Sequence, residues 1–325
     1  MTFDNHATAF NVPGCARYGC ALDWIECISN KFCLVMEENR MVSQKTLLFV
    51  GAHPDDETFA IGGTLARYAA SGVKVYYACA TRGDVGTADA ESMKGFNSVG
   101  EMRWAELQCA AKTLGLAGTF HLGYRDSGME GSKDNLNPDS FAMATIKEAS
   151  GRIVKIIREI KPQVVITHDP IGGYRHPDHI AAHRATVAAF KAASDVSLFP
   201  ETGPAFQTQK LYYNVFPRRW LKIAVKLMPL FGQNPHKFGR NRDIDFASMV
   251  EAEFPIHARI RIDKKYALIR NEASSCYRSQ LGGGPPRRGL FRFFSIFSSN
   301  QDFYMRAYPE VKGRLHETDL FSGVT

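Results

Sequence analysis

The sequence has few of the features that mark membrane-spanning or disulfide-stabilised proteins. No run of apolar residues approaches the roughly 20 that a helix needs to span a bilayer. The first 40 residues also lack a positively charged start followed by an apolar stretch, so no secretory signal is predicted. The seven cysteines form no C-x-x-C pair, and an odd number without paired short spacings argues against a disulfide framework. We therefore expect a cytoplasmic protein.

The start of the chain looks unlike the rest. Residues 1–44 show no sustained helical or alternating period, and they contain Cys15, Cys20, Cys27 and Cys33. The spacings of these cysteines match no common zinc-site pattern, so a metal site here is the less favoured alternative. We predict a poorly ordered N-terminal extension over residues 1–44, followed by a single domain over residues 45–325.

The composition, 45% hydrophobic and 22% charged, is that of a globular protein with a sizeable core. The formal net charge of +7 is concentrated in the last third of the chain, residues 217–325. A basic surface can face nucleic acid, anionic lipid or a phosphorylated substrate, but a solvated basic surface is the commoner case. We expect no nucleic-acid partner.

From residue 45 onward, short apolar runs alternate with stretches of helical periodicity. The predicted strands are Thr46–Val50, Val73–Cys79, Thr119–Leu122, Val164–Thr167 and Leu211–Phe216, and the predicted helices are Thr58–Ala70, Arg103–Leu114, Phe141–Ile160 and Asp178–Ala193. The segment 282–288 (GGGPPRR) is predicted to be a loop. This alternation predicts an α/β fold: a Rossmann-like, doubly wound, mostly parallel sheet with helices on both faces. Such sheets bind ligands at the carboxyl ends of their strands.

Two clusters of ionisable residues follow predicted strands at that edge. The first is HPDDE, residues 53–57, and the second is YRHPDH, residues 174–179. Imidazole nitrogens together with a carboxylate oxygen suit zinc, and a catalytic zinc keeps three protein ligands and one open position. Neighbouring side chains in a loop point in different directions, so one of the paired aspartates can bind a metal while the other acts on the substrate. Together the clusters predict a catalytic metal site.

Each cluster taken alone has a simpler explanation. A His-x-x-His at helical spacing is commonly a surface feature. Asp55 and Asp56 can cap the following helix, because a carboxylate accepts hydrogen bonds from unpaired backbone N–H groups. Glu57 fits a capping role, and we assign it no other. His168 and His183 lie near the clusters and could have a direct role, although histidines at such positions are commonly only packed or solvated.

The motif GAHPDDE after an apolar strand, with HPDH about 120 residues later, resembles the LmbE-like or PIG-L deacetylases. The resemblance extends from about Thr46 to Gln280. That family includes deacetylases of glucosaminyl-inositol intermediates in mycothiol synthesis, deacetylases of bacillithiol synthesis and the glycosylphosphatidylinositol-anchor enzyme. The resemblance implies an N-acetylglucosaminyl deacetylase: a zinc-dependent hydrolase that removes an N-acetyl group from a small-molecule amino sugar and releases acetate.

The resemblance also implies three groups of site residues. The metal ligands, for Zn²⁺ or alternatively Fe²⁺, would be His53, Asp56 and His179. The residues that act on the acetamide would be the general base Asp55, the oxyanion-stabilising His176 with its orienting partner Asp178, and Tyr174. The residues that contact the sugar would be Arg103 and Asp126.

Several of these assignments have alternatives. A charged His176 needs a raised pKa, and Asp178 is the expected local cause. Arg103 could instead form a surface pair with Glu106 on its own helix, and Asp126 could belong to a plain turn.

The sequence departs from the family near its end. Tyr277 stands where a histidine usually precedes the Ser-Gln pair at 279–280, so a contribution of this segment to the site stays open.

Three other functions stay open. An amidase that acts on a thiol conjugate or another non-sugar amide would use the same metal site. A nucleotide-binding module would need a glycine-rich phosphate loop after the first strand, and the carboxylates of GAHPDDE argue against one. The basic stretch 218–231 is compatible with an amphipathic helix that lies on a membrane surface, although we favour a lid over the mouth of the active site.

Overall fold

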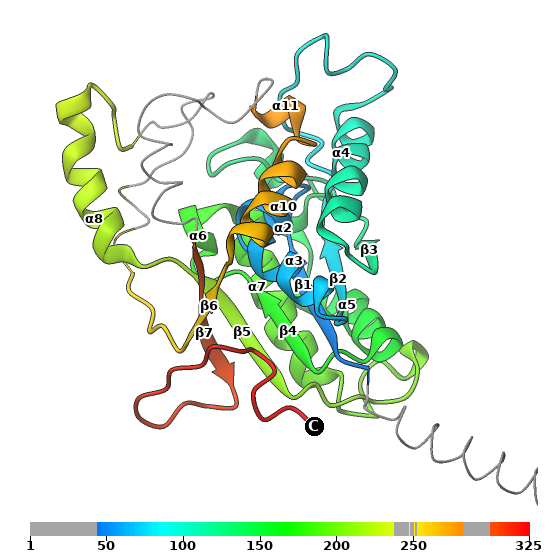
Figure 1. Ribbon diagram of the computed structural model, residues 1–325. Coiled ribbons are helices and arrows are strands. Elements are labelled where there is room, and N and C mark those ends of the chain that lie inside the picture. The colour runs from blue at the N-terminus through cyan, green and yellow to red at the C-terminus, as the bar shows by residue number, and fades with distance from the viewer. Residues whose placement is uncertain (1–43, 237–246, 248–249, 251, 282–299) are drawn as a thin grey trace, which may run out of the picture. The chain divides into compact units, whose positions relative to one another are not determined.

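The computed structural model describes residues 44–236, 247, 250, 252–281 and 300–325. The chain divides into two units, Met1–Gln44 and Lys45–Thr325, and nearly all described residues belong to the second. The expectations for residues 1–43 and for the loop at 282–288 lie outside the described residues. The centre of the second unit is a seven-stranded sheet that has helices on both faces (Figure 1).

The sheet has the strand order β3-β2-β1-β4-β5-β7-β6. Its strands are β1 (Thr46–Gly51), β2 (Lys74–Cys79), β3 (Gly118–His121), β4 (Val164–Thr167), β5 (Lys210–Val215), β6 (Ala258–Arg261) and β7 (Gln301–Tyr308). Strands β1 to β5 pair in parallel, whereas β7 pairs antiparallel with both β5 and β6. The strand order reverses between β1 and β4, and a doubly wound sheet binds ligands outside the carboxyl ends of such a strand pair.

Helices lie between the parallel strands along the chain, and further helices come after β5, the last parallel strand. They are α2 (Asp56–Phe59), α3 (Gly62–Ala70), α4 (Val99–Leu114), α5 (Ile146–Ile160), α6 (Gly172–Arg175), α7 (Pro177–Ala192), α8 (Arg218–Leu227), α10 (Lys264–Ser274) and α11 (Arg278–Leu281). Two of the long helices begin at side-chain caps: Ser98 accepts a hydrogen bond from the backbone of α4, and Thr145 from that of α5.

The core lies on both faces of the sheet. Every residue of β1 is buried. Leu48 and Val50 join the apolar cluster that α5 and α7 form on one face, and Leu47 and Phe49 join the cluster that includes α3 on the other. Helix α10 packs on α3 and α4 (Figure 1). The strands that carry the two motifs are therefore fixed from both sides.

The predicted fold class is confirmed, and β1 to β5 are the five predicted strands. Strands β6 and β7 were not predicted, because their antiparallel pairing joins segments that no local pattern links. The predicted helix Thr58–Ala70 is two helices, α2 and α3. The predicted helix Phe141–Ile160 begins only at Ile146, because its first residues form a separate 3₁₀ turn before the Thr145 cap.

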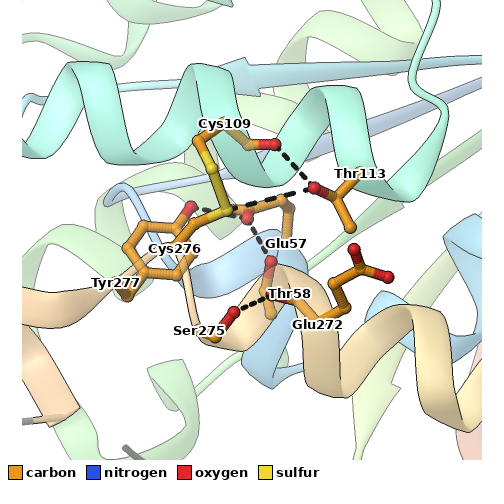
Figure 2. Close-up of a disulfide and its surroundings, with 8 residues drawn as sticks. All are labelled: Glu57, Thr58, Cys109, Thr113, Glu272, Ser275, Cys276 and Tyr277. Atoms are coloured by element: carbon orange, nitrogen blue, oxygen red, sulfur yellow. Dashed lines mark hydrogen bonds between the residues drawn. A yellow bond between two sulfur atoms is a disulfide. The ribbon is translucent and has the colours of Figure 1, made fainter. Parts of the chain in front are cut away.

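A disulfide joins Cys109 of α4 to Cys276, 167 residues later (Figure 2). The expectation that the cysteines form no disulfide is wrong for this pair. Only the packing of α10 on α4 brings the two residues together, so their spacing along the chain carries no signal.

Within the described segments, we find no helix with the length and apolar character needed to cross a membrane.

Candidate active site

The loop after β1 is closed by its own aspartate. Oδ2 of Asp56 accepts hydrogen bonds from the backbone N–H groups of Ala52 and His53, both at 2.9 Å. Tyr77 donates to the carbonyl oxygen of His53 at 2.7 Å. A Cβ on Gly51 would lie only 2.6 Å from the hydroxyl oxygen of Tyr77, so the exit from β1 requires glycine. These contacts hold the HPDDE segment at the carboxyl end of β1.

Three buried ligand atoms converge between this loop and α7. Nδ1 of His53 lies 3.2 Å from Nε2 of His179, and that nitrogen lies 3.3 Å from Oδ1 of Asp56. The three side chains form a group able to hold a metal ion. Two imidazole nitrogens and one carboxylate oxygen are a donor set that suits zinc. The structure thus brings together the three residues that the sequence analysis assigned as ligands.

A second group of possible ligands shares His53 and includes Asp126, His176 and Asp178. Nε2 of His53 lies 3.1 Å from Oδ2 of Asp178 and 3.6 Å from Oδ1 of Asp126. A metal-binding histidine typically directs its other ring nitrogen at a carboxylate, which fixes its tautomer and orientation. The aspartates of this second group therefore fit as outer partners of His53.

His168 contributes a further contact to the ligand group. Its Nε2 lies 3.2 Å from Oδ2 of Asp56, on the oxygen that does not face His179. His183 lies farther out, with Nδ1 2.9 Å from the carbonyl oxygen of His168 and its ring against Tyr213. His168 therefore orients a candidate ligand, and His183 supports His168.

Charges within the site fit a bound cation. Burial alone would lower the pKa of His53, but hydrogen bonds to Asp126 and Asp178 raise it well above its usual value. Burial alone would raise the pKa of Asp56, but His179 and His168 hold it well below its usual value. Carboxylates thus surround His53, and imidazoles surround Asp56.

The Asp55 side chain contacts Arg103 and belongs to neither group of possible ligands. Nη2 of Arg103 donates to Oδ2 of Asp55 at 2.9 Å and to the carbonyl oxygen of Pro54 at 2.8 Å. Burial raises the pKa of the Asp55 carboxyl to about 6, although the Arg103 guanidinium acts in the opposite direction. A pKa in this range suits a general base near neutral pH. The paired aspartates do diverge from one loop.

His176 and Tyr174 lie beside His179. The ring centroids of His176 and His179 are 5.1 Å apart, as are those of Tyr174 and His179. Nδ1 of His176 accepts the backbone N–H of Asp178 at 3.2 Å, which leaves Nε2 as the protonated nitrogen of a neutral ring. Burial, followed by the charges of His53 and His179, lowers the pKa of His176 well below its usual value. This direction is opposite to the one expected from sequence.

The side chain of Asp178 has other partners than His176. Its carboxylate accepts hydrogen bonds from the backbone N–H and the hydroxyl of Ser127, in addition to the contact with His53. Asp126 accepts the backbone N–H of Gly128 at 2.8 Å while facing His53, so it belongs both to a turn and to the site.

Arg103 is no surface residue, with 5% of its area exposed. Glu106, its alternative partner, instead accepts hydrogen bonds from the backbone N–H and hydroxyl of Ser279. Glu57, expected from the sequence only to cap a helix, is fully buried and hydrogen bonded to Tyr277. The burial of Arg103 and Glu57 could not be predicted from the sequence.

The chain is similar in sequence to known deacetylases. A family described as PIG-L, GlcNAc-PI de-N-acetylase, matches residues 48–190. A 1D-myo-inositol 2-acetamido-2-deoxy-alpha-D-glucopyranoside deacetylase of Streptomyces scabiei is 41% identical over 86% of this chain and 89% of its own length. A protein of the same name from Thermobispora bispora is 34% identical over 87% of this chain and all of its own length.

Solved structures share the fold at lower sequence identity. The N,N'-diacetylchitobiose deacetylase of Pyrococcus horikoshii aligns with a TM-score of 0.56 at 17% identity, over 90% of this chain and 94% of its own. The conserved protein TT1542 of Thermus thermophilus aligns with a TM-score of 0.53 at 23% identity, over 82% of this chain and 96% of its own. Because the relatives at 34% and 41% identity each align with most of this chain, the protein belongs to the PIG-L family of GlcNAc-PI de-N-acetylases.

Proposed function

We propose that the protein is a zinc-dependent N-deacetylase that hydrolyses the acetamide of an N-acetylglucosamine glycoside. The preferred substrate is one in which the sugar is linked to inositol, as in the names of the relatives at 34% and 41% identity. The products are acetate and the free amino sugar. The observation that carries the proposal is the convergence of His53, Asp56 and His179 next to Asp55, a carboxylate that is held separately.

The ligand group and the base have distinct tasks in this reaction. A zinc ion held by His53, Asp56 and His179 would polarise the acetamide carbonyl and lower the pKa of a bound water to about 7. Asp55 takes the proton of the attacking water, and Arg103 fixes the orientation of its carboxylate. Because the pKa of Asp55 is raised to about 6, the same carboxyl can return a proton to the departing amine.

His176 and Tyr174 serve the developing oxyanion. The neutral His176 ring carries its proton on Nε2, since its Nδ1 accepts a backbone N–H. Burial raises the pKa of Tyr174 well above its usual value, so its hydroxyl keeps its proton and remains a donor. Two donors at the position where negative charge develops stabilise the transition state more than the ground state.

Asp126 and Arg103 are the candidates for contacts with the sugar. Asp126 lies beside His53 and is a candidate acceptor for a sugar hydroxyl. The guanidinium of Arg103 already binds Asp55 and Pro54, so we propose that any sugar contact of Arg103 is secondary to this one. The cytoplasmic location and the boundary near residue 44 stay predictions, and peripheral membrane contact stays the less favoured alternative to a lid.

Metal analysis combined with acetate release tests this proposal. We expect about one zinc per chain in the purified protein, and release of acetate from an N-acetylglucosaminyl-inositol at a higher kcat/KM than from simple N-acetylglucosamine. A thiol-conjugate amide serves as the competing substrate. Faster cleavage of that amide than of any N-acetyl sugar would replace the deacetylase by the amidase alternative, and full activity of metal-free protein would overturn both.

A further inference from the structure

The backbone of Asp55 has an unusual conformation. Its φ is 113°, a region that residues other than glycine rarely adopt. Such a conformation persists only where the surroundings hold it, and it is common at functional sites. Arg103 holds the Asp55 side chain and the carbonyl oxygen of Pro54, and the Asp55 carbonyl oxygen accepts the backbone N–H groups of Thr58 and Phe59. The backbone N–H of Asp55 needs a further contact.

Glu57 supplies that contact. The backbone N–H of Asp55 donates to Oε2 of Glu57 at 3.1 Å. The Glu57 side chain is fully buried, and its other oxygen, Oε1, accepts hydrogen bonds from the hydroxyls of Thr58 and Tyr277. The bond from Tyr277 measures 2.6 Å and spans 220 positions of the sequence. Tyr277 therefore connects the C-terminal part of the domain to the loop that carries Asp55.

The position of Tyr277 is itself secured by neighbouring groups. Its ring is buried among apolar residues of α3, α4 and α10. The preceding residue, Cys276, forms the disulfide with Cys109 of α4, and Figure 2 shows the Tyr277 side chain directed at Glu57 beside this bond. Helix α4 also carries Arg103. Helix α4 thus supports Asp55 in two ways. Arg103 contacts the Asp55 side chain directly, and the disulfide supports the Asp55 backbone through Tyr277 and Glu57.

We propose that Tyr277 is a positioning residue for the deacetylation reaction, which acts on the base Asp55 through the buried carboxylate of Glu57. The disulfide between Cys109 and Cys276 holds Tyr277 in place. The inference rests on the proposed role of Asp55 as general base. Tyr277 contacts Glu57 and Phe59 rather than the ligand group, so its loss disturbs the orientation of the base and leaves metal binding intact.

The first test removes only the hydroxyl. In Tyr277→Phe, Glu57 loses one donor and holds the Asp55 backbone less firmly. We expect kcat to fall about tenfold, the scale of one buried hydrogen bond, while KM changes less than about twofold and zinc content stays at one per chain. Tyr68→Phe is the matched control, because it removes a buried tyrosine hydroxyl that donates to Asp319 at 2.7 Å rather than to Glu57. Its kcat should equal that of the wild type.

The second test uses Glu57 itself. Glu57→Gln keeps an oxygen for the backbone N–H of Asp55 and a polar group for Tyr277, whereas Glu57→Leu keeps neither. We expect the glutamine variant to retain several-fold more kcat than the leucine variant. Since Tyr277 acts through Glu57, Tyr277→Phe should lower kcat much less in the Glu57→Leu background than in the wild type. Full additivity of the two substitutions would overturn the proposed coupling.

The third test removes the tether. Cys109 is exposed, and Cys109→Ser breaks the disulfide without changing the buried surroundings of Tyr277. We expect a lower melting temperature and a fall in kcat smaller than that of Tyr277→Phe, with zinc retained. An unchanged kcat in this variant would remove the disulfide from the proposal.

Asp55→Asn, measured in parallel, tests the base role of Asp55 separately from the positioning role of Tyr277. If Asp55→Asn loses turnover while Tyr277→Phe keeps wild-type kcat, the positioning role is refuted and the base role stands. If Asp55→Asn retains near-normal turnover, the base role fails and the positioning role fails with it. A fall in kcat of Tyr277→Phe that parallels loss of zinc, or an equal fall in Tyr68→Phe, would also refute the positioning role.

Discussion

Substitution of the paired aspartates one at a time separates the base from the metal ligand. Asp55→Asn preserves the shape of the side chain and an oxygen for Arg103, but it cannot accept a proton from water. Removal of a general base costs about 100-fold to 10,000-fold in rate. A hundredfold loss corresponds to about 2.7 kcal/mol in the activation free energy. We therefore expect kcat to fall at least about a hundredfold, with one zinc per chain retained.

Asp56→Asn should give the opposite result. Oδ2 of Asp56 accepts two backbone N–H groups and contacts His168, and Oδ1 faces His179, so this carboxylate both shapes the loop and completes the ligand group. Loss of a partner outside the ligand group already costs about 10-fold to 100-fold in metal affinity. We expect at least about a hundredfold weaker zinc binding, and partial recovery of activity when zinc is added in excess.

The assay pairs zinc content of the purified variants with initial rates of acetate release, with and without added zinc. Circular dichroism and a melting curve of each variant serve as folding controls. The assignment is reversed if Asp55→Asn emerges free of metal while Asp56→Asn is fully loaded. Near-normal zinc content and rate in both variants would be the more serious result, because the HPDDE loop would then be structural and the site would lie elsewhere.

Three further predictions concern the ligands, the core and pH. His53→Ala and His179→Ala should each lose most of the bound zinc, whereas His183→Ala, which removes a ring that contacts His168 rather than the ligand group, should keep it; metal analysis decides. Leu65→Ala, at a fully buried position, should lower the free energy of unfolding by about 2–5 kcal/mol, while Leu136→Ala, 80% exposed, should change it by less than about 0.5 kcal/mol in urea titrations. Burial raises the pKa of Asp302 from 3.8 to about 6, so its folded form favours the protonated carboxyl and stability is lost as pH rises between these values. Asp302→Asn should therefore gain about 3 kcal/mol relative to the wild type between pH 3 and pH 7, and a pH-independent difference would contradict this reasoning.

Local sequence was sufficient to predict the parallel strands of the sheet. Apolar runs such as Thr46–Val50 and Val164–Thr167 are buried on both faces, and this burial leaves a signal in the residues themselves. The same reasoning placed the two motifs at the carboxyl edge, because that position follows from strand direction alone. Family resemblance then assigned His53, Asp56 and His179, which the structure brings together.

Tertiary structure decided the features that depend on contacts between distant segments. The antiparallel strands β6 and β7, the disulfide between Cys109 and Cys276 and the bond from Tyr277 to Glu57 each join parts of the chain that no local pattern relates. The pKa shifts of the site residues also could not be predicted from the sequence. The pKa of His176 is lowered because burial and the nearby imidazoles outweigh the carboxylates, and the sum of such opposing effects depends on where the folded chain places each group.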